Sequence, residues 1–268
     1  MIGNYGKYFD YNWFEEHLSL KKIQAKNRWM RLHRLLKKYH VKPKRLLDVG
    51  CGHGLFLASA KNFLIETVGV DYQSQATHYA RDQFGLNIIE GDFRSLSDEG
   101  SLPEKHFDII TSWHCLEHDR DPLAYMKGIT KLLTTDGKVL IAVPNVRTPG
   151  MKIMREDWVW CQQPYVHVFH FTEKSIALLA RKSGLKVISI WTRDTWDAHL
   201  AFDSYVLPRV MRLAKRLHYF GHWPAFWFVE CSRLACYAAT CYKHWLLGKE
   251  RTDMHGSELL MLAEREDI

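Results

Sequence analysis

Three glycines at alternating positions follow a short apolar run that contains an aspartate. The stretch 46–54 is Leu-Leu-Asp-Val-Gly-Cys-Gly-His-Gly, and a helical pattern begins at Leu55. A strand that enters a glycine turn and then a helix brings bare backbone N–H groups and the positive end of a helix to one place. Glycine suits the turn because a Cβ would keep the backbone from a ligand and would penalise a positive φ. The pattern predicts a nucleotide-type site at the carboxyl edge of a parallel sheet.

The spacing of the glycines and the aspartate narrow the class of ligand. A dinucleotide-binding turn has the pattern G-x-G-x-x-G, whereas this turn is G-x-G-x-G with Leu55 directly after Gly54. Asp48 precedes the first glycine, where a carboxylate would be badly placed against a pyrophosphate but would suit a cationic amine. We infer a nucleoside that carries an amino-acid tail. The alternative is that the glycines serve only the geometry of a turn.

A second acidic residue ends the next predicted strand. Asp71 closes the strand 65–71 about twenty residues after the glycine turn, where a carboxylate can accept hydrogen bonds from both hydroxyls of a ribose. Tyr72, next to it, can pack against the face of an adenine. The alternative for Asp71 is an N-cap of the helix predicted over 73–84.

The chain resembles the class I S-adenosylmethionine-dependent methyltransferases. The resemblance rests on D-V-G-C-G-x-G at 48–54 and on L-E-H-x-x-D-P at 116–122, which is similar to the loop after strand four in small-molecule enzymes, including those of quinone biosynthesis. It implies an α/β fold with a doubly wound, seven-stranded, mostly parallel sheet. It also implies S-adenosylmethionine as cofactor and S-adenosylhomocysteine as product. The cofactor-binding residues that we expect are Asp48, Gly50, Cys51, Gly52, Gly54, Asp71, Tyr72, Asp92, Phe93 and Trp113.

One expected cofactor contact rests on a common turn pattern, and two short motifs of this chain differ from those of related methyltransferases. Asp92 is expected to accept from the adenine amino group with Phe93 beside it, although a Gly-Asp step is also a common turn. In the quinone branch a Glu often stands three residues before the Glu of L-E-H; this chain has His114 there, which argues against the metal dependence carried by that motif. Methyltransferases of exocyclic amines carry N/D-P-P-Y where this chain has residues 112–115, Ser-Trp-His-Cys, so that chemistry is less expected.

The expected cofactor carries an activated methyl group, so the protein would mainly align a nucleophile with it. An oxygen nucleophile also needs a base, and a histidine, whose ordinary pKa is near about 6.5, suits that step. We expect His118 to be the base, with His167 or His114 as second choices, and Glu117 to orient a histidine or a substrate hydroxyl. The alternative for His118 is loop packing and helix capping. His167 and His170 form an H-x-x-H pair, but no H-E-x-x-H pattern or nearby carboxylate completes it, so no metal is expected.

The rest of the chain supplies the elements that must position these residues. Residues 1–42, with crowded aromatics and a basic amphipathic helix over 19–39, are predicted to form a lid, or else to pack into the core. The cofactor-binding core is expected over 43–195 and 254–268. A basic, aromatic-rich helical insertion over 196–253 would be a substrate lid or a dimer surface. The predicted strands are 45–49, 65–71, 86–90, 107–113, 139–143, 185–192 and 257–263, the later helices are 123–133 and 173–183 with Gly184 as cap, and 135–138 is a predicted turn.

Composition bounds the compartment and the partners. The 268 residues are enough for one domain with an appendage. The net charge of +7 is uneven, because residues 21–45 hold eleven Lys or Arg and no Asp or Glu. Such a segment could meet an anionic substrate, a membrane surface or RNA, or be a solvated helix face. Six cysteines without a C-x-x-C pair and an N-terminus without a signal pattern predict a cytoplasmic protein.

Three hypotheses for function remain open at this point. The first is methyl transfer to a small-molecule acceptor, a hydroxyl of an aromatic or quinone-like, sugar or lipid-linked compound. The second is an RNA methyltransferase that uses the basic helices, although nucleic acid is the less expected partner. The third is a catalytically silent cofactor-binding partner protein. The insertion could also form a homodimer interface or a peripheral contact with a membrane. We do not expect it to span a membrane, because Pro224, Glu230 and Arg233 interrupt its apolar run.

Overall fold

The computed structural model describes residues 11–63, 66–148, 151, 161, 166–193, 254 and 257–266, without the side chains of residues 11–13, 20 and 62. The predicted insertion over 196–253 and the aromatic residues before position 11 lie outside the described residues. The elements are α2 (Tyr11–Glu16), α3 (Leu18–Lys38), β1 (Arg45–Val49), α4 (Leu55–Ala60), η1 (Lys61–Phe63), β2 (Glu66–Asp71), α5 (Ser74–Phe84), β3 (Asn87–Glu90), α6 (Phe93–Asp98), β4 (Phe107–Trp113), η2 (Leu116–His118), α7 (Pro122–Leu132), β5 (Leu133–Pro144), α9 (Glu173–Lys182), β6 (Leu185–Arg193) and β7 (Glu258–Arg265).

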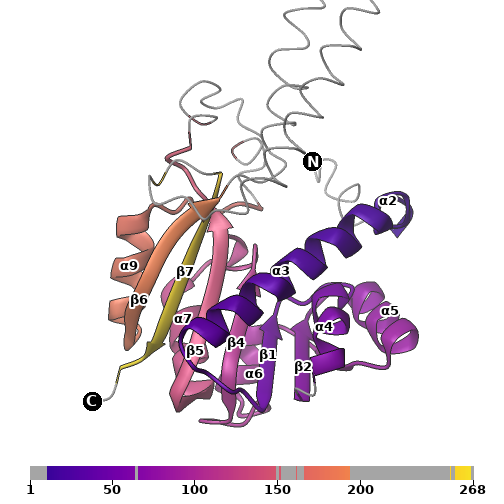
Figure 1. The fold of residues 1–268 in the computed structure, drawn as a ribbon, viewed down its shortest axis with the longest axis horizontal. Helices are drawn as coiled ribbons and strands as arrows, with labels where there is room; N and C mark the ends of the chain where they lie inside the picture. The colour runs from indigo at the N-terminus through magenta and orange to yellow at the C-terminus, as the bar shows by residue number, and fades with distance from the viewer. Residues whose placement is uncertain are drawn as a thin grey trace, which may run out of the picture. The chain divides into compact units, whose positions relative to one another are not determined.

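The described strands form one seven-stranded sheet with the order β3-β2-β1-β4-β5-β7-β6 (Figure 1). Strand β1 pairs in parallel with both β2 and β4, with Val49 opposite Val70 on one side and Ser112 on the other. Strand β2 pairs in parallel with β3. Strand β7 runs antiparallel to β6. The predicted fold class, a mostly parallel, doubly wound sheet, is therefore confirmed.

The chain divides into two compact units, each of which is described by itself. The first comprises residues 1–113, 124–140 and 264–268, and the second comprises residues 114–123 and 141–263. Within the described residues, no helix is both long and apolar enough to cross a membrane.

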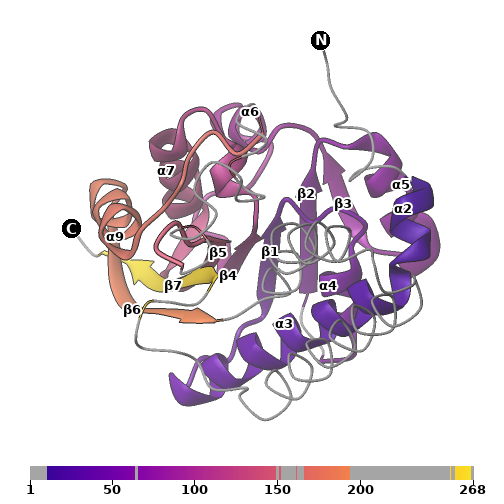
Figure 2. The same ribbon diagram turned by 90° about the horizontal axis from the view of Figure 1, so that it is seen from above.

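The first unit is built on β1, which is buried on both faces. Leu46, Leu47 and Val49 are fully buried, as expected for a central parallel strand covered by helices. Helices α3 and α4 lie along one face of β1 and β2, and α6 and α7 lie on the other (Figure 2). Helix α3 buries a stripe at helical spacing that includes Trp29 and Leu32. Most of its charged residues are exposed, but Lys21, Arg28 and Arg31 are half-buried.

The second unit contains α9, β6 and most of β7. Helix α9 begins at a capping box, in which Thr172 Oγ1 accepts from the N–H of Ser175 and Ser175 Oγ accepts from the N–H of Thr172. The helix ends at Lys182, and Gly184 follows with a φ of +83°, which confirms the predicted glycine stop. The helix packs against β6, the strand that follows it.

One local prediction differs from the structure, and two short helices were not predicted. The turn predicted over 135–138 is part of β5, because the neighbouring end of β7 holds this segment extended. There the Arg265 guanidinium donates to the Leu133 carbonyl (3.0 Å), and Lys138 pairs with Glu264 (2.8 Å). Helices α2 and α6 were not predicted, since six residues make less than two turns and give a weak periodic signal.

Candidate active site

The glycine turn joins β1 to α4, and two of its glycines have different physical roles. Gly54 has a φ of +72°, and a Cβ there would lie 2.6 Å from Leu86 Cδ1 and 2.8 Å from Ala80 Cβ. Gly52 has a φ of +51°, and a Cβ there would meet no protein atom within 4 Å. Gly54 is therefore needed for packing against the rest of the first unit, whereas Gly52 keeps an open space clear.

The turn does not present a row of bare N–H groups, in contrast to the sequence argument. Helix α4 has only six residues, so its dipole is also short. The turn instead leaves the space beside it free of side chains. The turn N–H groups donate within the protein: Gly50 and Cys51 to the Val70 carbonyl (2.8 and 3.1 Å), Gly52 to Asp71 Oδ2 (2.7 Å), and Gly54 to the Cys51 carbonyl (3.0 Å).

Asp48 lies inside the sheet, 2% exposed, at the end of β1. The Thr111 hydroxyl of the adjacent strand donates to its Oδ1 (2.6 Å). Burial raises the pKa of Asp48 to about 7, against the opposing effects of the Thr111 hydrogen bond and the Arg28 charge. A carboxylate with a raised pKa gains from a nearby cation, which agrees with the expected cationic amine.

Asp71 ends β2 and faces the glycine turn. Its Oδ2 accepts from the N–H of Gly52 (2.7 Å), and its Oδ1 accepts from the N–H of Gln73 (2.9 Å). The N-cap of α5 is Gln73, so Asp71 is not the cap that the alternative reading proposed. Burial raises the pKa of Asp71 even though both N–H groups act against that rise. A carboxylate has about four acceptor positions, so the side chain can still accept a further hydrogen bond.

The positions of Tyr72, Trp113 and Cys51 still allow the expected contacts with the cofactor. Tyr72 is 75% exposed beside Asp71, and Trp113 is buried, with the Phe56 ring at 5.4 Å and the Arg28 guanidinium at 5.2 Å from its ring. The Cys51 side chain is buried beneath the turn. These positions are compatible with the predicted cofactor contacts, which stay predictions.

Asp92 and Phe93 already have structural roles. Asp92 is the N-cap of α6, and its Oδ1 accepts from both the N–H and the hydroxyl of Ser95, each at 3.0 Å. Phe93 is buried against the Tyr125 ring, with centroids 4.9 Å apart. Asp92 is exposed and keeps its second oxygen, so the adenine contact remains open to it, but Phe93 packs into the core.

Helix α2 contributes a contact that the sequence did not predict. The Phe14 ring stacks on the His53 ring of the glycine turn, with centroids 3.6 Å apart and an angle of 8° between the planes. Burial, followed by the charge of Lys21, lowers the pKa of His53 to about 4, so this imidazole is neutral. Part of the predicted N-terminal lid therefore packs on the turn, while its closing motion stays a prediction.

A second cluster of titratable side chains lies in the other unit, around Glu117 of η2. The Glu117 side chain is fully buried, and its Oε1 lies 3.3 Å from His114 Nδ1 and 3.9 Å from His118 Nε2. Burial alone would raise the pKa of Glu117, but the hydrogen bond and charge of His114 outweigh it and lower that pKa. Glu117 is therefore a buried carboxylate that stays ionised.

Backbone hydrogen bonds bring His167 to this cluster. The Glu117 carbonyl accepts from the N–H groups of Val168 (2.9 Å) and Phe169 (3.2 Å). The His118 and His167 rings then lie 4.9 Å apart. Burial, followed by the charge of His118, lowers the pKa of His167 to about 4, so His167 is neutral and a weak base.

The tautomer of His118 follows from its partner. Its Nδ1 lies 2.8 Å from the Val166 carbonyl oxygen, which can only accept a hydrogen bond. Nδ1 must therefore carry the hydrogen, and in the neutral ring Nε2 keeps a lone pair on the side of Glu117. The side chain is one third exposed, so a ligand can reach it.

His114 is held between two buried carboxylates. Its Nε2 lies 2.7 Å from Glu258 Oε1, and Arg193 also donates to Glu258. Burial alone would lower the pKa of His114, but Glu117 and Glu258 raise it to about 9. At neutral pH His114 is therefore an imidazolium without a lone pair, which disfavours it as a base.

His114→Gln should reveal this charge in the pH dependence of stability. A pKa raised from 6.5 to about 9 stabilises the fold fully below pH 6.5, and that contribution is lost as the pH rises through 9. The melting-temperature advantage of the wild type over His114→Gln should therefore be largest, on the order of 5 °C, below pH 6.5 and should shrink towards pH 9. Titrating groups away from His114 cancel in the difference, whereas Glu117 and Glu258 belong to the same coupled cluster. Parallel curves from pH 6 to 9 would contradict the assignment.

Glu117, His118 and His167 also converge as potential ligands. Each offers one donor atom, and within the described residues these three atoms lie within 4.8 Å of one another. A carboxylate with two imidazoles suits a divalent transition metal. His170, the other member of the H-x-x-H pair, is not part of this group. The expectation that no metal binds stays a prediction.

Comparison with known proteins places these observations in context. A family model described as a methyltransferase domain matches residues 21–190. The ubiquinone biosynthesis O-methyltransferase of Cereibacter sphaeroides is 32% identical over 151 residues, which cover 53% of this chain and 60% of that protein. The protein of the same name from Neisseria meningitidis is 33% identical over 106 residues, 38% of this chain and 44% of that protein. The chain thus spans about 60% or less of the length of these relatives.

Solved structures share the fold at low sequence identity. A SAM-dependent methyltransferase from Archaeoglobus fulgidus matches with a TM-score of 0.59 and 16% identity, covering 96% of this chain and 100% of that one. The plantazolicin methyltransferase BamL, in complex with a triazolic desmethylPZN analog and SAH, matches with a TM-score of 0.58 and 15% identity, covering 96% and 89%. These likenesses support the seven-stranded fold described above.

Proposed function

Because the chain belongs to the class I S-adenosylmethionine-dependent methyltransferase family, we propose that it methylates a hydroxyl of a small-molecule acceptor. The cofactor of the family is S-adenosylmethionine, and S-adenosylhomocysteine is its product. The acceptor class that we propose is an aromatic or quinone-like compound, with sugar or lipid-linked compounds as alternatives. The names of the relatives, which specify O-methylation in ubiquinone biosynthesis, support the aromatic class.

In this proposal the cofactor binds beside the glycine turn. The remaining lone pairs of Asp71 accept the ribose hydroxyls, Asp48 faces the amino group of the methionine tail, and Tyr72 covers the adenine. The open space at Gly52 supports this arrangement, as does the exposure of Tyr72. The sulfonium methyl that the cofactor supplies is already activated, so the protein has to position it and manage one proton.

The observation that carries O-methylation is the His118 tautomer. With Nδ1–H donated to the Val166 carbonyl, Nε2 can accept the proton of an acceptor hydroxyl. S-adenosylmethionine, when bound, would supply the methyl group to this hydroxyl oxygen. The buried charge of Glu117, 3.9 Å from Nε2, stabilises the imidazolium that results. His114 keeps Glu117 ionised, and His167 stays neutral as a hydrogen-bonding neighbour of the acceptor.

A methyl-transfer assay with the purified full chain tests this function. Catechol- and hydroquinone-type phenols, a sugar panel and total RNA are each incubated with S-adenosylmethionine, with and without EDTA. The expected product is a phenol that has gained one CH2 by mass spectrometry, in equal yield with EDTA. Loss of turnover in EDTA would show a metal requirement, for which Glu117, His118 and His167 are the candidate ligands. Methylation of RNA, together with RNA binding that weakens steeply as the salt concentration rises, would instead support the RNA methyltransferase hypothesis. Cofactor binding without any methylated product would favour the third hypothesis, a catalytically silent partner protein.

Gly52→Ala and Gly54→Ala should separate cofactor binding from folding. Both place a Cβ at a positive φ, which costs about 1 kcal/mol. Gly54→Ala also clashes with Leu86 and Ala80, so its melting temperature should fall further than that of Gly52→Ala. Gly52→Ala should instead lose most of the thermal shift given by S-adenosylhomocysteine, because its methyl enters the open space. A full ligand shift in Gly52→Ala would place the cofactor elsewhere.

The partners expected from the sequence, a homodimer or a membrane surface contacted through residues 196–253, involve residues outside the described structure. They stay predictions, as does the cytoplasmic location.

A further inference from the structure

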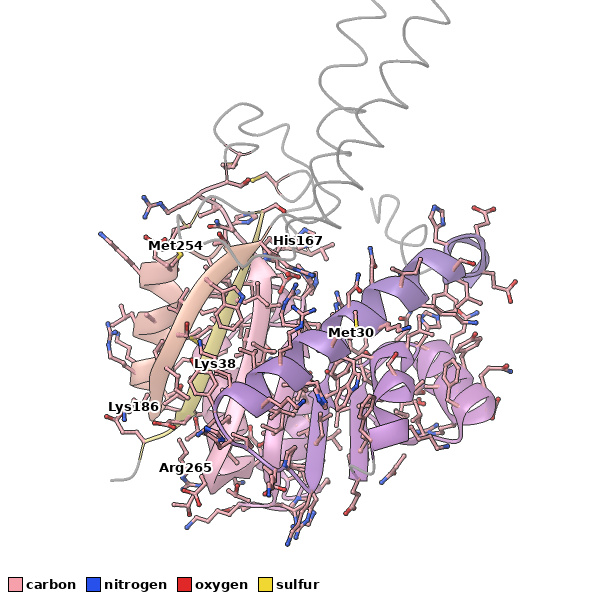
Figure 3. All side chains as sticks on the ribbon, in the orientation of Figure 1. Met30, Lys38, His167, Lys186, Met254 and Arg265 are labelled. Atoms are coloured by element: carbon pink, nitrogen blue, oxygen red, sulfur yellow. The ribbon has the colours of Figure 1, made fainter. Side chains whose placement is uncertain are left out.

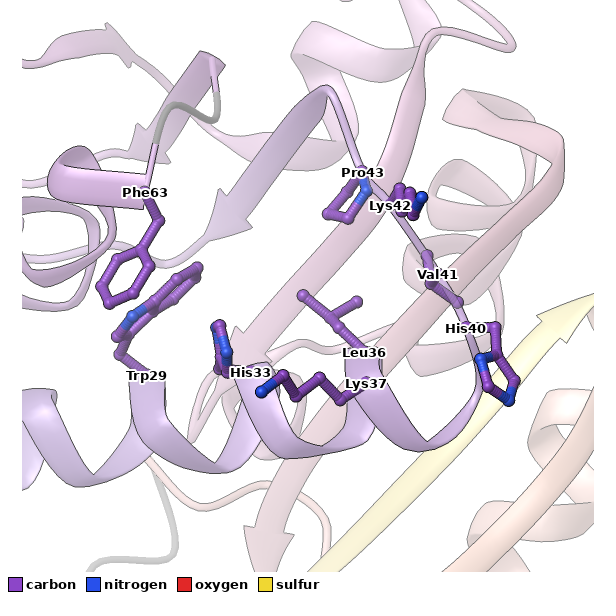
Figure 4. A pocket seen from close by; sticks show the side chains of 9 residues that line it. All are labelled: Trp29, His33, Leu36, Lys37, His40, Val41, Lys42, Pro43 and Phe63. Carbon is purple, nitrogen blue, oxygen red and sulfur yellow. The ribbon is translucent and has the colours of Figure 1, made fainter.

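A pocket of about 340 Å³ opens in the first unit between the C-terminal end of α3 and Phe63 of η1 (Figure 4). The pocket adjoins the start of β1 at Arg45, whereas the glycine turn follows the other end of that strand. It is therefore separate from the proposed cofactor site. Nine described residues line it, and none of them is acidic.

The floor of the pocket is a well-defined helix stop. The N–H of Val41 donates to the Leu36 carbonyl (2.8 Å), and the N–H of His40 donates to the Lys37 carbonyl (3.2 Å). This is the Schellman arrangement, in which the last helix carbonyls are satisfied and no longer face a ligand. Glycine usually occupies the position of His40, whose φ is +54°. An imidazole there costs about 1 kcal/mol and places a polar side chain at the rim.

One wall of the pocket is aromatic. The Trp29 and Phe63 ring centroids lie 4.7 Å apart, and the His33 ring lies 5.4 Å from Phe63. Trp29 is only 3% exposed, but Phe63 is 47% exposed and presents its ring to solvent. Within the described residues, Trp29 Nε1 is buried and has no hydrogen-bond acceptor. The wall thus offers aromatic ring surfaces tilted against one another, against which an apolar ring or chain can pack.

The open side of the pocket is positively charged. Lys37 and Lys42 line the pocket, and both are exposed. Lys37 follows His33 by one helical turn, and the Lys37 side chain extends toward His33 (Figure 4). Asp108 is not among the residues that line the pocket, and its Oδ2 accepts from the backbone N–H groups of Lys44 (2.8 Å) and Arg45 (2.9 Å). The outer side of α3 is also basic, as at Lys38 (Figure 3).

We propose that this pocket binds an organic phosphate that carries an apolar ring or chain. The apolar part packs against Trp29 and Phe63, and the phosphate oxygens accept from Lys37 and Lys42. Two ammonium groups with imidazoles beside them match the charge and the several acceptor oxygens of a phosphate. Each half of such a ligand uses a different part of the pocket. The apolar half contacts the aromatic wall, and the phosphate contacts the lysines.

Calorimetry with 1-naphthyl phosphate on the full chain tests the proposal, with 1-naphthol and inorganic phosphate as the separate halves. We expect naphthyl phosphate to bind at least about ten times more tightly than either half. Lys37→Gln, Lys42→Gln and Phe63→Ala should each weaken it about tenfold, which corresponds to about 1.4 kcal/mol. Lys22→Gln, an exposed lysine of α3 outside the pocket, is the matched control and should bind like the wild type. The S-adenosylhomocysteine shift should be unchanged in all four variants, and the melting temperature should be unchanged in the three lysine variants. Phe63→Ala should melt at a lower temperature, because it loses the contact with Trp29.

Two results would overturn the proposal: naphthyl phosphate that binds no more tightly than its halves, or a Lys22→Gln variant as weak as Lys37→Gln. A vesicle arm distinguishes the source of the phosphate. Co-sedimentation with phosphatidic acid vesicles that is lost in Lys37→Gln and Lys42→Gln would support the pocket with a lipid as its source. Binding of naphthyl phosphate without co-sedimentation would support it with a soluble compound.

Discussion

His118→Ala should lower kcat by roughly 10²- to 10⁴-fold while the affinity for S-adenosylhomocysteine stays nearly the same. With Nδ1–H donated to the Val166 carbonyl, Nε2 of His118 is positioned to accept a proton. His114 is an imidazolium held by two carboxylates, and burial gives His167 a pKa of about 4. Neither can take over the proton of an acceptor hydroxyl at neutral pH. Single-turnover kinetics with a saturating phenol measures the loss.

His118→Asn makes this test specific for the base. The asparagine amide can still donate to the Val166 carbonyl, as Nδ1 does in the wild type, but it has no basic nitrogen. A proton-accepting role requires that His118→Asn be about as slow as His118→Ala. If Asn restores turnover, His118 serves the loop and not the proton. His78→Ala, an exposed histidine of α5, is the control and should keep wild-type turnover.

The elements that position the site follow from local sequence patterns. The bounds of β4 match the prediction, and the glycine turn, Asp71 at the end of β2 and the start of α9 at Thr172 lie where their residue types indicate. These features depend on neighbours within a few residues, such as a run of buried apolar side chains or a cap. That is why most strands and the turn could be located from local patterns, whereas the doubly wound sheet was expected from the family resemblance.

The electrostatics of the site could not be predicted in this way. The charge of His114 depends on Glu258, which lies 144 residues further along the chain. Arg193 donates to the same carboxylate. Asp48 owes its hydrogen bond to Thr111, 63 residues away on the neighbouring strand. No spacing rule connects such pairs, so the sequence could name His118 as the expected base but kept His114 and His167 as second choices. The structure separates them by their partners.

Asp71→Ala should remove most of the thermal stabilisation that S-adenosylhomocysteine gives. A ligand at one hundred times its Kd stabilises the folded state by about 2.7 kcal/mol, which raises the melting temperature of a chain of this size by roughly 5 to 10 °C. Asp71 is expected to accept two charge-assisted hydrogen bonds from the ribose, each contributing about 1.5 to 3 kcal/mol. Their loss should weaken binding at least about 100-fold, so that the same ligand concentration gives a shift of about 1 °C.

The design has to separate the ribose contact from the turn that Asp71 also holds. Removing the carboxylate frees the N–H groups of Gly52 and Gln73, so the melting temperature without ligand should fall, and each shift is measured against its own variant. Asp71→Asn keeps one oxygen for the turn but loses the charge, and should give an intermediate shift. Asp82→Ala, an exposed aspartate on α5, should keep the full shift. A full shift in Asp71→Ala would mean that the ribose is bound by other residues, and the proposed orientation of the cofactor along β2 would have to be abandoned.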